Sequence, residues 1–163
     1  MLVALFAAAL VAQSPPPADI VAYTLGAAPR VDDIARVSIG MRFRGDADGE
    51  TRIRLPFGYA GETDLHRNIH DLALETPGEI LNGDAPHMKI IRHPPGEMIV
   101  LNYEIRPDRE GDPHADALDY HRPVVTQTYI HLIGNTIFIR ADHSPGREYS
   151  FREHALEAGW PLI

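Results

Sequence analysis

A chain of 163 residues, 44% of them hydrophobic, suits one globular domain and leaves little room for two. The formal net charge is −8 and the 15 Lys and Arg residues form no basic block, which disfavours nucleic acid or an anionic membrane surface as the partner. Because there is no cysteine, disulfides, thiolate metal sites and a cysteine nucleophile are excluded.

The first segment has the composition of a targeting signal. Residues 1–12 are nearly all small or apolar, and they are too few to span a bilayer, which takes about 20 residues. We interpret residues 1–12 as the core and end of a signal peptide and residues 13–19 as a proline-rich spacer, although no Lys or Arg precedes the apolar run. The alternative is an ordinary strand or helix. We therefore expect an exported protein, periplasmic or secreted, with no membrane span in the mature chain and a single domain over residues 20–163.

Strand patterns begin at the short apolar segment from Ile20 to Leu25. The clearest pattern runs from Ile34 to Phe43, where apolar and polar residues alternate with the period of a strand that has one buried face. A turn composition follows at residues 45–49, and the alternation resumes from Thr51 to Leu55 and stops at Pro56. The two alternating segments predict a β-hairpin.

The middle of the chain continues in the same way. The spacing between Asp64 and Leu74 predicts a turn of helix or a loop that enters a strand. A strand from Met88 to Ile91 leads into the turn His93-Pro94-Pro95-Gly96, and another strand runs from Met98 to Ile105.

The last third adds a loop and three extended segments. The polar stretch from Asp108 to Asp119 predicts a loop, and the strand from Val124 to Leu132 is expected to return through Gly134-Asn135 as Thr136 to Arg140, forming a second hairpin. A last extended piece begins at Tyr149. About eight short strands at this spacing predict an all-β domain, an antiparallel β-sandwich with little helix.

His66 and His70 have the H-x-x-x-H spacing of a zinc metalloprotease helix. That mechanism also requires a Glu directly after the first His to act as the base, and here the position is Arg67. No third ligand follows at an obvious place. We therefore favour surface or strand-edge histidines over a metal site.

Two further groups of residues carry weaker signals. Imidazole and carboxylate side chains that could hold a divalent ion gather in the polar loop, at His114, Asp116, Asp119 and His121. We favour a hydrated acidic loop there. Asp142 and His143 lie near Ser144, but the chain has no G-x-S-x-G nucleophile elbow and no phosphate- or dinucleotide-binding motif. We assign no catalytic residue, metal ligand or cofactor to this chain.

The C-terminal residues 159–163 are mostly apolar, whereas natural C-termini are usually polar and frayed. This ending is expected where a following strand or domain continues the fold. Trp160 would then be a core anchor or would cap a domain interface.

Several segments together resemble one protein family. The segment Phe57 to Thr63 (FGYAGET) and the segment Arg67 to Leu72 (RNIHDL) resemble the aromatic, glycine-rich turn and the following strand in the N-terminal domain of the PDZ-containing glycyl aminopeptidases. The predicted hairpin Tyr129 to Arg140 and the closing Glu157 to Trp160 (EAGW) are similar to later strands and the junction of that domain. The pieces follow in the same order along roughly residues 20–163.

The resemblance implies a β-sandwich that packs on a zinc catalytic domain in the same polypeptide. It implies no activity for this chain, because the H-E-x-x-H helix of that family lies in the next domain and is absent from this sequence. By position, Tyr59 and Arg67 would lie near a domain-facing turn, with Trp160 at the junction. The first hypothesis is therefore an accessory domain of an exported metallopeptidase-like protein.

Two other hypotheses stay open. One is a stand-alone periplasmic module that binds a peptide, a carbohydrate or another protein through its loops or a strand edge. The other is a small metal-dependent hydrolase that uses His66, His70 and the acidic loop, which predicts stoichiometric zinc in the purified protein.

Overall fold

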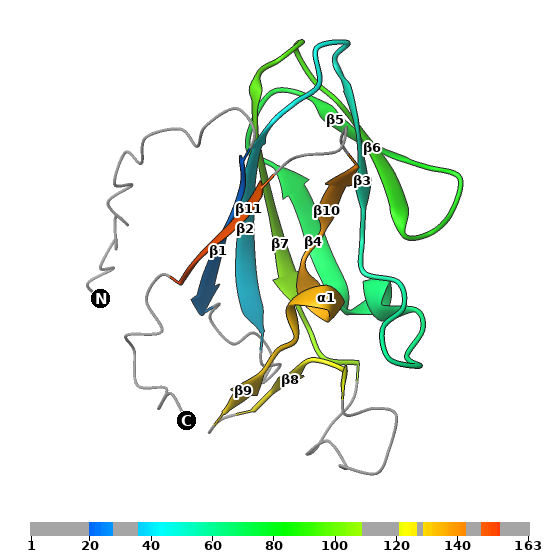
Figure 1. Ribbon diagram of the computed structural model, residues 1–163, viewed down its shortest axis with the longest axis vertical. Helices are drawn as coiled ribbons and strands as arrows, with labels where there is room; N and C mark the ends of the chain where they lie inside the picture. Colours follow the sequence, from blue (N-terminus) through cyan, green and yellow to red (C-terminus); the bar gives the residue numbers. More distant parts are fainter. Residues whose placement is uncertain (1–19, 28–35, 109–120, 127–128, 143–147, 154–163) are drawn as a thin grey trace, which may run out of the picture.

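The computed structural model describes residues 20–27, 36–108, 121–126, 129–142 and 148–153, which form two β-sheets packed face to face (Figure 1). The larger sheet has the strand order β11-β1-β2-β7-β4, with β1 Ile20–Ala27, β2 Val37–Arg44, β4 Ile69–Leu74, β7 Met98–Ile105 and β11 Glu148–Glu153. The smaller sheet has the order β10-β3-β6-β5, with β3 Glu50–Arg54, β5 Glu79–Asn82, β6 Met88–Arg92 and β10 Arg140–Asp142. Neighbouring strands are antiparallel in both sheets apart from β1 and β11, which are parallel. The predicted antiparallel β-sandwich is confirmed.

The remaining described elements are short. β8 Val124–Val125 and β9 Ile130–His131 pair with each other, while η1 Leu65–Asn68 and α1 Gly134–Ile137 each make about one helical turn. Neither of these helices is long or apolar enough to cross a membrane, and the described residues contain no other.

The alternation in the sequence produces the core. In β2 the residues Val37, Ile39, Met41 and Phe43 are fully buried and their neighbours face outward, as the period of two requires. β7 alternates in the same way across its eight residues. These side chains meet Ile53, Ile91 and Ile139 of the opposite layer in one continuous cluster. Burial of each large apolar side chain contributes about 1.5–3 kcal/mol, so the space between the sheets carries most of the stability.

The first predicted hairpin is wrong, although both of its strands exist. β2 pairs with β1 and β7 in the five-stranded sheet, whereas β3 pairs with β6 and β10 in the other. The chain therefore crosses from one layer to the other between Arg44 and Glu50. Alternation shows which face of a strand is buried, and it carries no information on the partner strand.

Two such crossings run side by side. The connection β6–β7 lies against the connection β2–β3, and the Gly45 amide donates to the Glu97 carbonyl at 2.8 Å while the Gly96 amide donates to Asp46 at 3.1 Å. The buried His93 ring fills the space between them and hydrogen bonds to Thr51 Oγ1 at 2.9 Å. A Cβ on Gly45 would stand 2.2 Å from His93 Cε1, so only glycine fits there.

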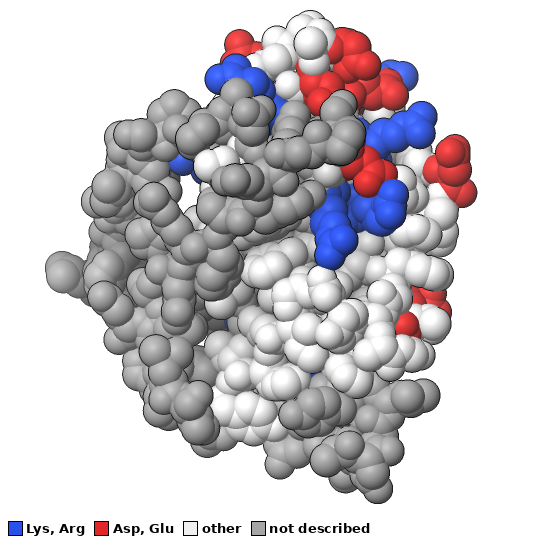
Figure 2. Space-filling model, viewed as in Figure 1, with Lys and Arg blue, Asp and Glu red and all other residues white. Residues whose placement is uncertain are grey.

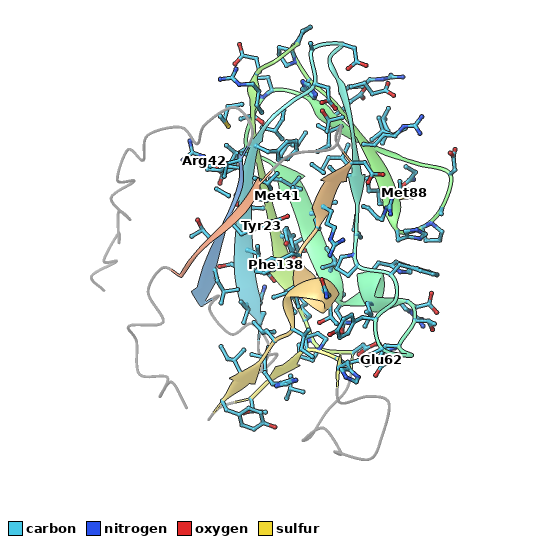
Figure 3. The ribbon with its side chains drawn as sticks, viewed as in Figure 1. Tyr23, Met41, Arg42, Glu62, Met88 and Phe138 are labelled. Carbon is cyan, nitrogen blue, oxygen red and sulfur yellow. The ribbon has the colours of Figure 1, made fainter. Side chains whose placement is uncertain are left out.

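The second predicted hairpin, Val124 to Arg140, is also wrong. A short hairpin forms earlier, between β8 and β9, and Gly134–Ile137 folds into the α1 turn before β10 joins β3. The Thr136 hydroxyl donates to Ile133 O at 2.9 Å, and Ile137 is buried in the core. Figure 3 shows Tyr23 and Phe138 together between the layers, with ring centroids 4.5 Å apart.

The other strand predictions agree with the structure. The segment from Asp64 to Leu74 is a helical turn, η1, that enters the strand β4, as expected. β1, β6, β7 and β11 lie at the predicted positions. The signal peptide of residues 1–12, the spacer of residues 13–19, the polar loop from residue 109 onward and Trp160 all fall outside the described residues.

Candidate functional site

The segment from Phe57 to Asn68 forms one end of the sandwich after β3, and it includes Phe57 to Thr63, one of the four segments on which the family resemblance rests. Tyr59 and Glu62 pair through two backbone hydrogen bonds of 3.1 and 2.9 Å around Ala60 and Gly61. Both central residues have positive φ, 49° and 92°, which is the geometry of a two-residue hairpin turn of type I′. The left-handed conformation costs about 1–2 kcal/mol for the alanine.

Backbone strain is concentrated around this segment. Three non-glycine described residues have positive φ: Ala60 and Asp64 lie in the loop, and Asp71 lies in β4 at the register shift between His70 and Ala73. Such conformations persist only where surrounding contacts hold them, and they cluster at binding and switch regions of proteins.

An ion-pair network holds the turn in place. Glu62 is only 7% exposed, and its Oε2 accepts from Arg122 Nε at 2.7 Å. The same guanidinium donates to Asp108 Oδ2 at 2.6 Å and to the Thr63 carbonyl at 2.9 Å. The second carboxylate oxygen, Oε1, is buried without a hydrogen-bond partner among the described residues. Figure 3 shows Glu62 at the end of the molecule near β8. This network joins the loop to the chain segments after β7 and before β8.

Asn68 makes the second attachment. Its side chain is fully buried, donates to Leu65 O at 3.2 Å and accepts from the Asp108 amide at 3.0 Å. Its own carbonyl accepts from the Arg106 amide at 3.0 Å. Leu65 is fully buried beside it. Hydrogen bonds therefore hold the helical turn η1 and the loop against the segments after β7 and before β8.

Three rings from three segments meet on the outside of this loop. Phe57 is 45% exposed and is the one large hydrophobic side chain that the described part of the chain presents to solvent. Its ring stacks on His87 with centroids 4.3 Å apart and lies 6.2 Å from His66, while the two imidazoles are 6.3 Å apart. We call Phe57, His66 and His87 the ring cluster.

Burial lowers the pKa of His66 in the ring cluster. The Asp64 carboxylate opposes this shift, whereas His87, Arg67 and Lys89 reinforce it. The imidazole of His66 is therefore mainly neutral at pH 7.

Charge is unevenly distributed over the face that Figure 2 shows. Lys and Arg side chains gather in one group on this face, with acidic side chains beside them. Arg54 of β3 and Arg140 of β10 are both exposed and lie opposite each other in the ladder, and Arg54 pairs with Asp142. The surface below this group, over α1, carries almost no Lys or Arg and has acidic residues only at its margin. In α1 the exposed residues are Gly134 and Asn135.

The structure separates the residues of the H-x-x-x-H spacing. η1 ends at Asn68, so His66 lies on the helical turn and His70 on β4, where it is in register with Glu104 of β7. The described residues contain no group of three or more His, Asp or Glu with the geometry to hold a metal ion. Of the predicted acidic loop cluster the structure describes His121 alone, and the Tyr59 ring meets it edge-on at 5.5 Å. Asp142 pairs with Arg54 at 2.9 Å.

The predicted domain-interface residues lie in different surroundings. Tyr59 is half-buried at the hairpin turn, Arg67 is exposed on η1, and Trp160 lies outside the described residues. No local pattern in the sequence pointed to His87 or Arg122 as members of this group. His87 reaches Phe57 because its carbonyl accepts from the Leu55 amide, where the ladder between β3 and β6 continues. That pairing is not visible in the sequence.

Compared with protein-family models and with curated proteins, the chain matches none of them.

Proposed function

We propose that this chain is a β-sandwich accessory domain of an exported, metallopeptidase-like protein, and that it supports a zinc catalytic domain without supplying catalytic groups itself. The contact surface is the loop from Phe57 to Asn68 with the exposed Arg67 and the neighbouring Tyr59. The single observation that carries the proposal is that this loop is attached by buried hydrogen bonds and exposes an aromatic side chain, Phe57.

Rigid attachment matters because a docking surface that is already ordered loses little conformational entropy when it binds. The loop is held by the buried Glu62–Arg122 pair and by Asn68, and it keeps two strained residues in place. Exposed aromatic and Arg side chains are the residue types that most often anchor protein interfaces. The same loop carries the resemblance to the N-terminal domain of the glycyl aminopeptidases, in which that domain packs on the catalytic domain.

The genomic sequence gives the first test. We expect the reading frame to continue past the codon for Ile163 and to encode H-E-x-x-H within a few hundred residues. A stop codon at that point would contradict a catalytic domain in the same polypeptide and would favour a stand-alone binding module.

The second test uses the longer polypeptide that contains both domains. Scanning calorimetry is expected to show one coupled unfolding transition, because docked domains stabilise each other. Phe57→Ala together with Arg67→Ala should split the transition in two, while Arg92→Ala, an exposed arginine of β6 that pairs with Glu79, should leave it coupled. A transition that stays coupled in the double variant would contradict docking through this loop.

The exposed ring cluster also favours a second candidate, a periplasmic module that binds a peptide or carbohydrate. Phe57 stacked on His87 offers a flat aromatic surface of the kind on which apolar side chains and sugar rings pack. The discriminating measurement is titration of the isolated domain with short peptides and oligosaccharides, followed by NMR. Shifts centred on residues 57–66 that Phe57→Ala removes would support this second function.

A further inference from the structure

The ring cluster joins the loop to the smaller sheet. Phe57 is the third residue beyond β3, His66 lies on η1, and His87 directly precedes β6. Two backbone hydrogen bonds flank the rings, from the Leu55 amide to His87 O at 2.8 Å and from the Leu65 amide to Phe57 O at 3.1 Å. The packing of the rings therefore helps to close the loop against β6.

The His66 imidazole is poorly arranged to carry a charge. The Nδ1 atoms of His66 and His87 are buried and have no hydrogen-bond partner among the described residues. A proton added at Nδ1 would find no acceptor, and a buried donor without an acceptor is costly. The neutral form of the His66 ring satisfies the site better, because an unprotonated Nδ1 leaves an uncharged acceptor unpaired instead of a charged donor.

The charged groups around His66 add to this effect. Asp64, on the residue before η1, is the one group that favours a proton on His66. His87 from the segment before β6, Lys89 from β6 and Arg67 from η1 all oppose it. An imidazolium at His66 would thus face two fixed cations and a second imidazole against one exposed carboxylate.

We propose that the ring cluster is a proton-sensitive clasp: a proton taken up by His66 in mild acid loosens the ring packing and opens the loop between Phe57 and Leu65, whose ends the Leu65–Phe57 backbone hydrogen bond joins. The proton comes from solvent, and no bond other than the new N–H forms. During this opening Glu62 and Asn68 keep the loop attached to Arg122 and to the Asp108 amide. The inference concerns the loop used in the proposed function, but it requires no partner.

The test is an NMR titration of the isolated domain from pH 8 to pH 5. The C2–H resonance of His66 should titrate with a midpoint below 6.5. Over the same range the Leu65 amide, corrected for its intrinsic exchange rate, should lose protection against hydrogen exchange. The largest expected loss of Leu65 protection is set by the difference between the pKa of His66 in the closed loop and in the open loop. Each pKa unit of this difference corresponds to a loss of about tenfold.

Four variants separate the clasp from a general effect of acid. His66→Gln should abolish the pH dependence of Leu65 protection and leave its value near that of the wild type at pH 8. His87→Gln should raise the midpoint of His66, because His87 opposes a proton on His66. Asp64→Asn should lower the midpoint, because the Asp64 carboxylate favours that proton. His70→Gln, on β4 outside the cluster, should change neither quantity.

Three results would overturn the clasp: a His66 midpoint at or above 6.5, Leu65 protection that is unchanged between pH 8 and pH 5, or an equal loss in His66→Gln. The outcome is independent of docking. One pair of results would support the clasp and reject the proposed function. The isolated domain would lose Leu65 protection, and the two-domain polypeptide would keep one coupled unfolding transition in the variant with Phe57→Ala and Arg67→Ala. The reverse pair of results would reject the clasp alone.

Discussion

Glu62 illustrates how one buried carboxylate can fix a loop. Its pair with Arg122 is nearly enclosed, since the two side chains are 6% and 16% exposed. Pairs of this kind add little net stability when compared with apolar residues, but removal of one partner leaves the other with an unmet charge. The Glu62–Arg122 contact therefore matters more for the position of the hairpin turn than for the total stability.

Glu62→Ala is expected to destabilise the domain by about 1–3 kcal/mol, below the cost of breaking an isolated buried pair, because Arg122 keeps Asp108 and the Thr63 carbonyl. Urea unfolding monitored by circular dichroism measures the change. Asp108→Ala, which removes the more exposed partner, should cost less. A Glu62→Ala domain as stable as the wild type would contradict the structural role given to this pair.

The residues of the candidate site were only partly predictable from the sequence. The segment Phe57 to Thr63 was identified through its resemblance to a glycine-rich turn, and the structure has a tight turn there at Ala60-Gly61. His87 and Arg122 join the site through contacts across 30 and 60 residues, from Phe57 and Glu62 respectively. Contacts at such separations depend on which strands pair, and no local pattern records that.

At the scale of elements, the sequence identifies strands better than their partners. β2 and β7 alternate cleanly because one face of each packs in the core, so their positions were predictable. Both hairpin predictions failed at the connections. A turn such as Gly45 to Gly49 has the composition of a hairpin turn, but here it leads the chain across to the other sheet. Turn composition predicts that the chain changes direction, but it does not predict which sheet the next strand joins.

The crossing itself can be tested through Gly45. Gly45→Ala would place its Cβ against the His93 ring, and displacement of that ring would break its hydrogen bond with Thr51. We expect a loss of about 1–3 kcal/mol, as for other overpacked sites. In a His93→Ala background the same substitution should cost much less, because the obstructing ring is absent. Unfolding free energies of the four proteins form a double-mutant cycle, and strictly additive values would show that the ring is not the cause.

At the scale of the whole molecule, segments far apart in the chain complete both sheets. β11 closes the larger sheet beside β1, and β10 closes the smaller one beside β3. The two layers are also joined by tyrosines that reach across the core. Tyr23 donates its hydroxyl to Ile139 O, and Tyr103 donates to Ile137 O at 3.1 Å while it accepts from the Ile139 amide at 3.3 Å. The segment between α1 and β10 is therefore held by the sheet that it faces, which explains why it does not form the hairpin that its sequence suggests.

Tyr103 also makes the free energy of unfolding depend on pH in the alkaline range. Burial raises its pKa well above the ordinary value of 10, because the phenolate cannot be solvated in the core. Above pH 10 the unfolded chain therefore binds fewer protons at this residue than the folded chain, and stability falls as pH rises.

Tyr103→Phe should lose about 1–3 kcal/mol at pH 7, since Ile137 O and the Ile139 amide lose a buried partner. The variant has no phenol to ionise, so its deficit relative to the wild type should narrow between pH 9 and pH 11. Urea unfolding at several pH values measures this narrowing. A deficit for Tyr103→Phe that stays constant up to pH 11 would mean that the core of the sandwich opens to solvent before the phenol ionises.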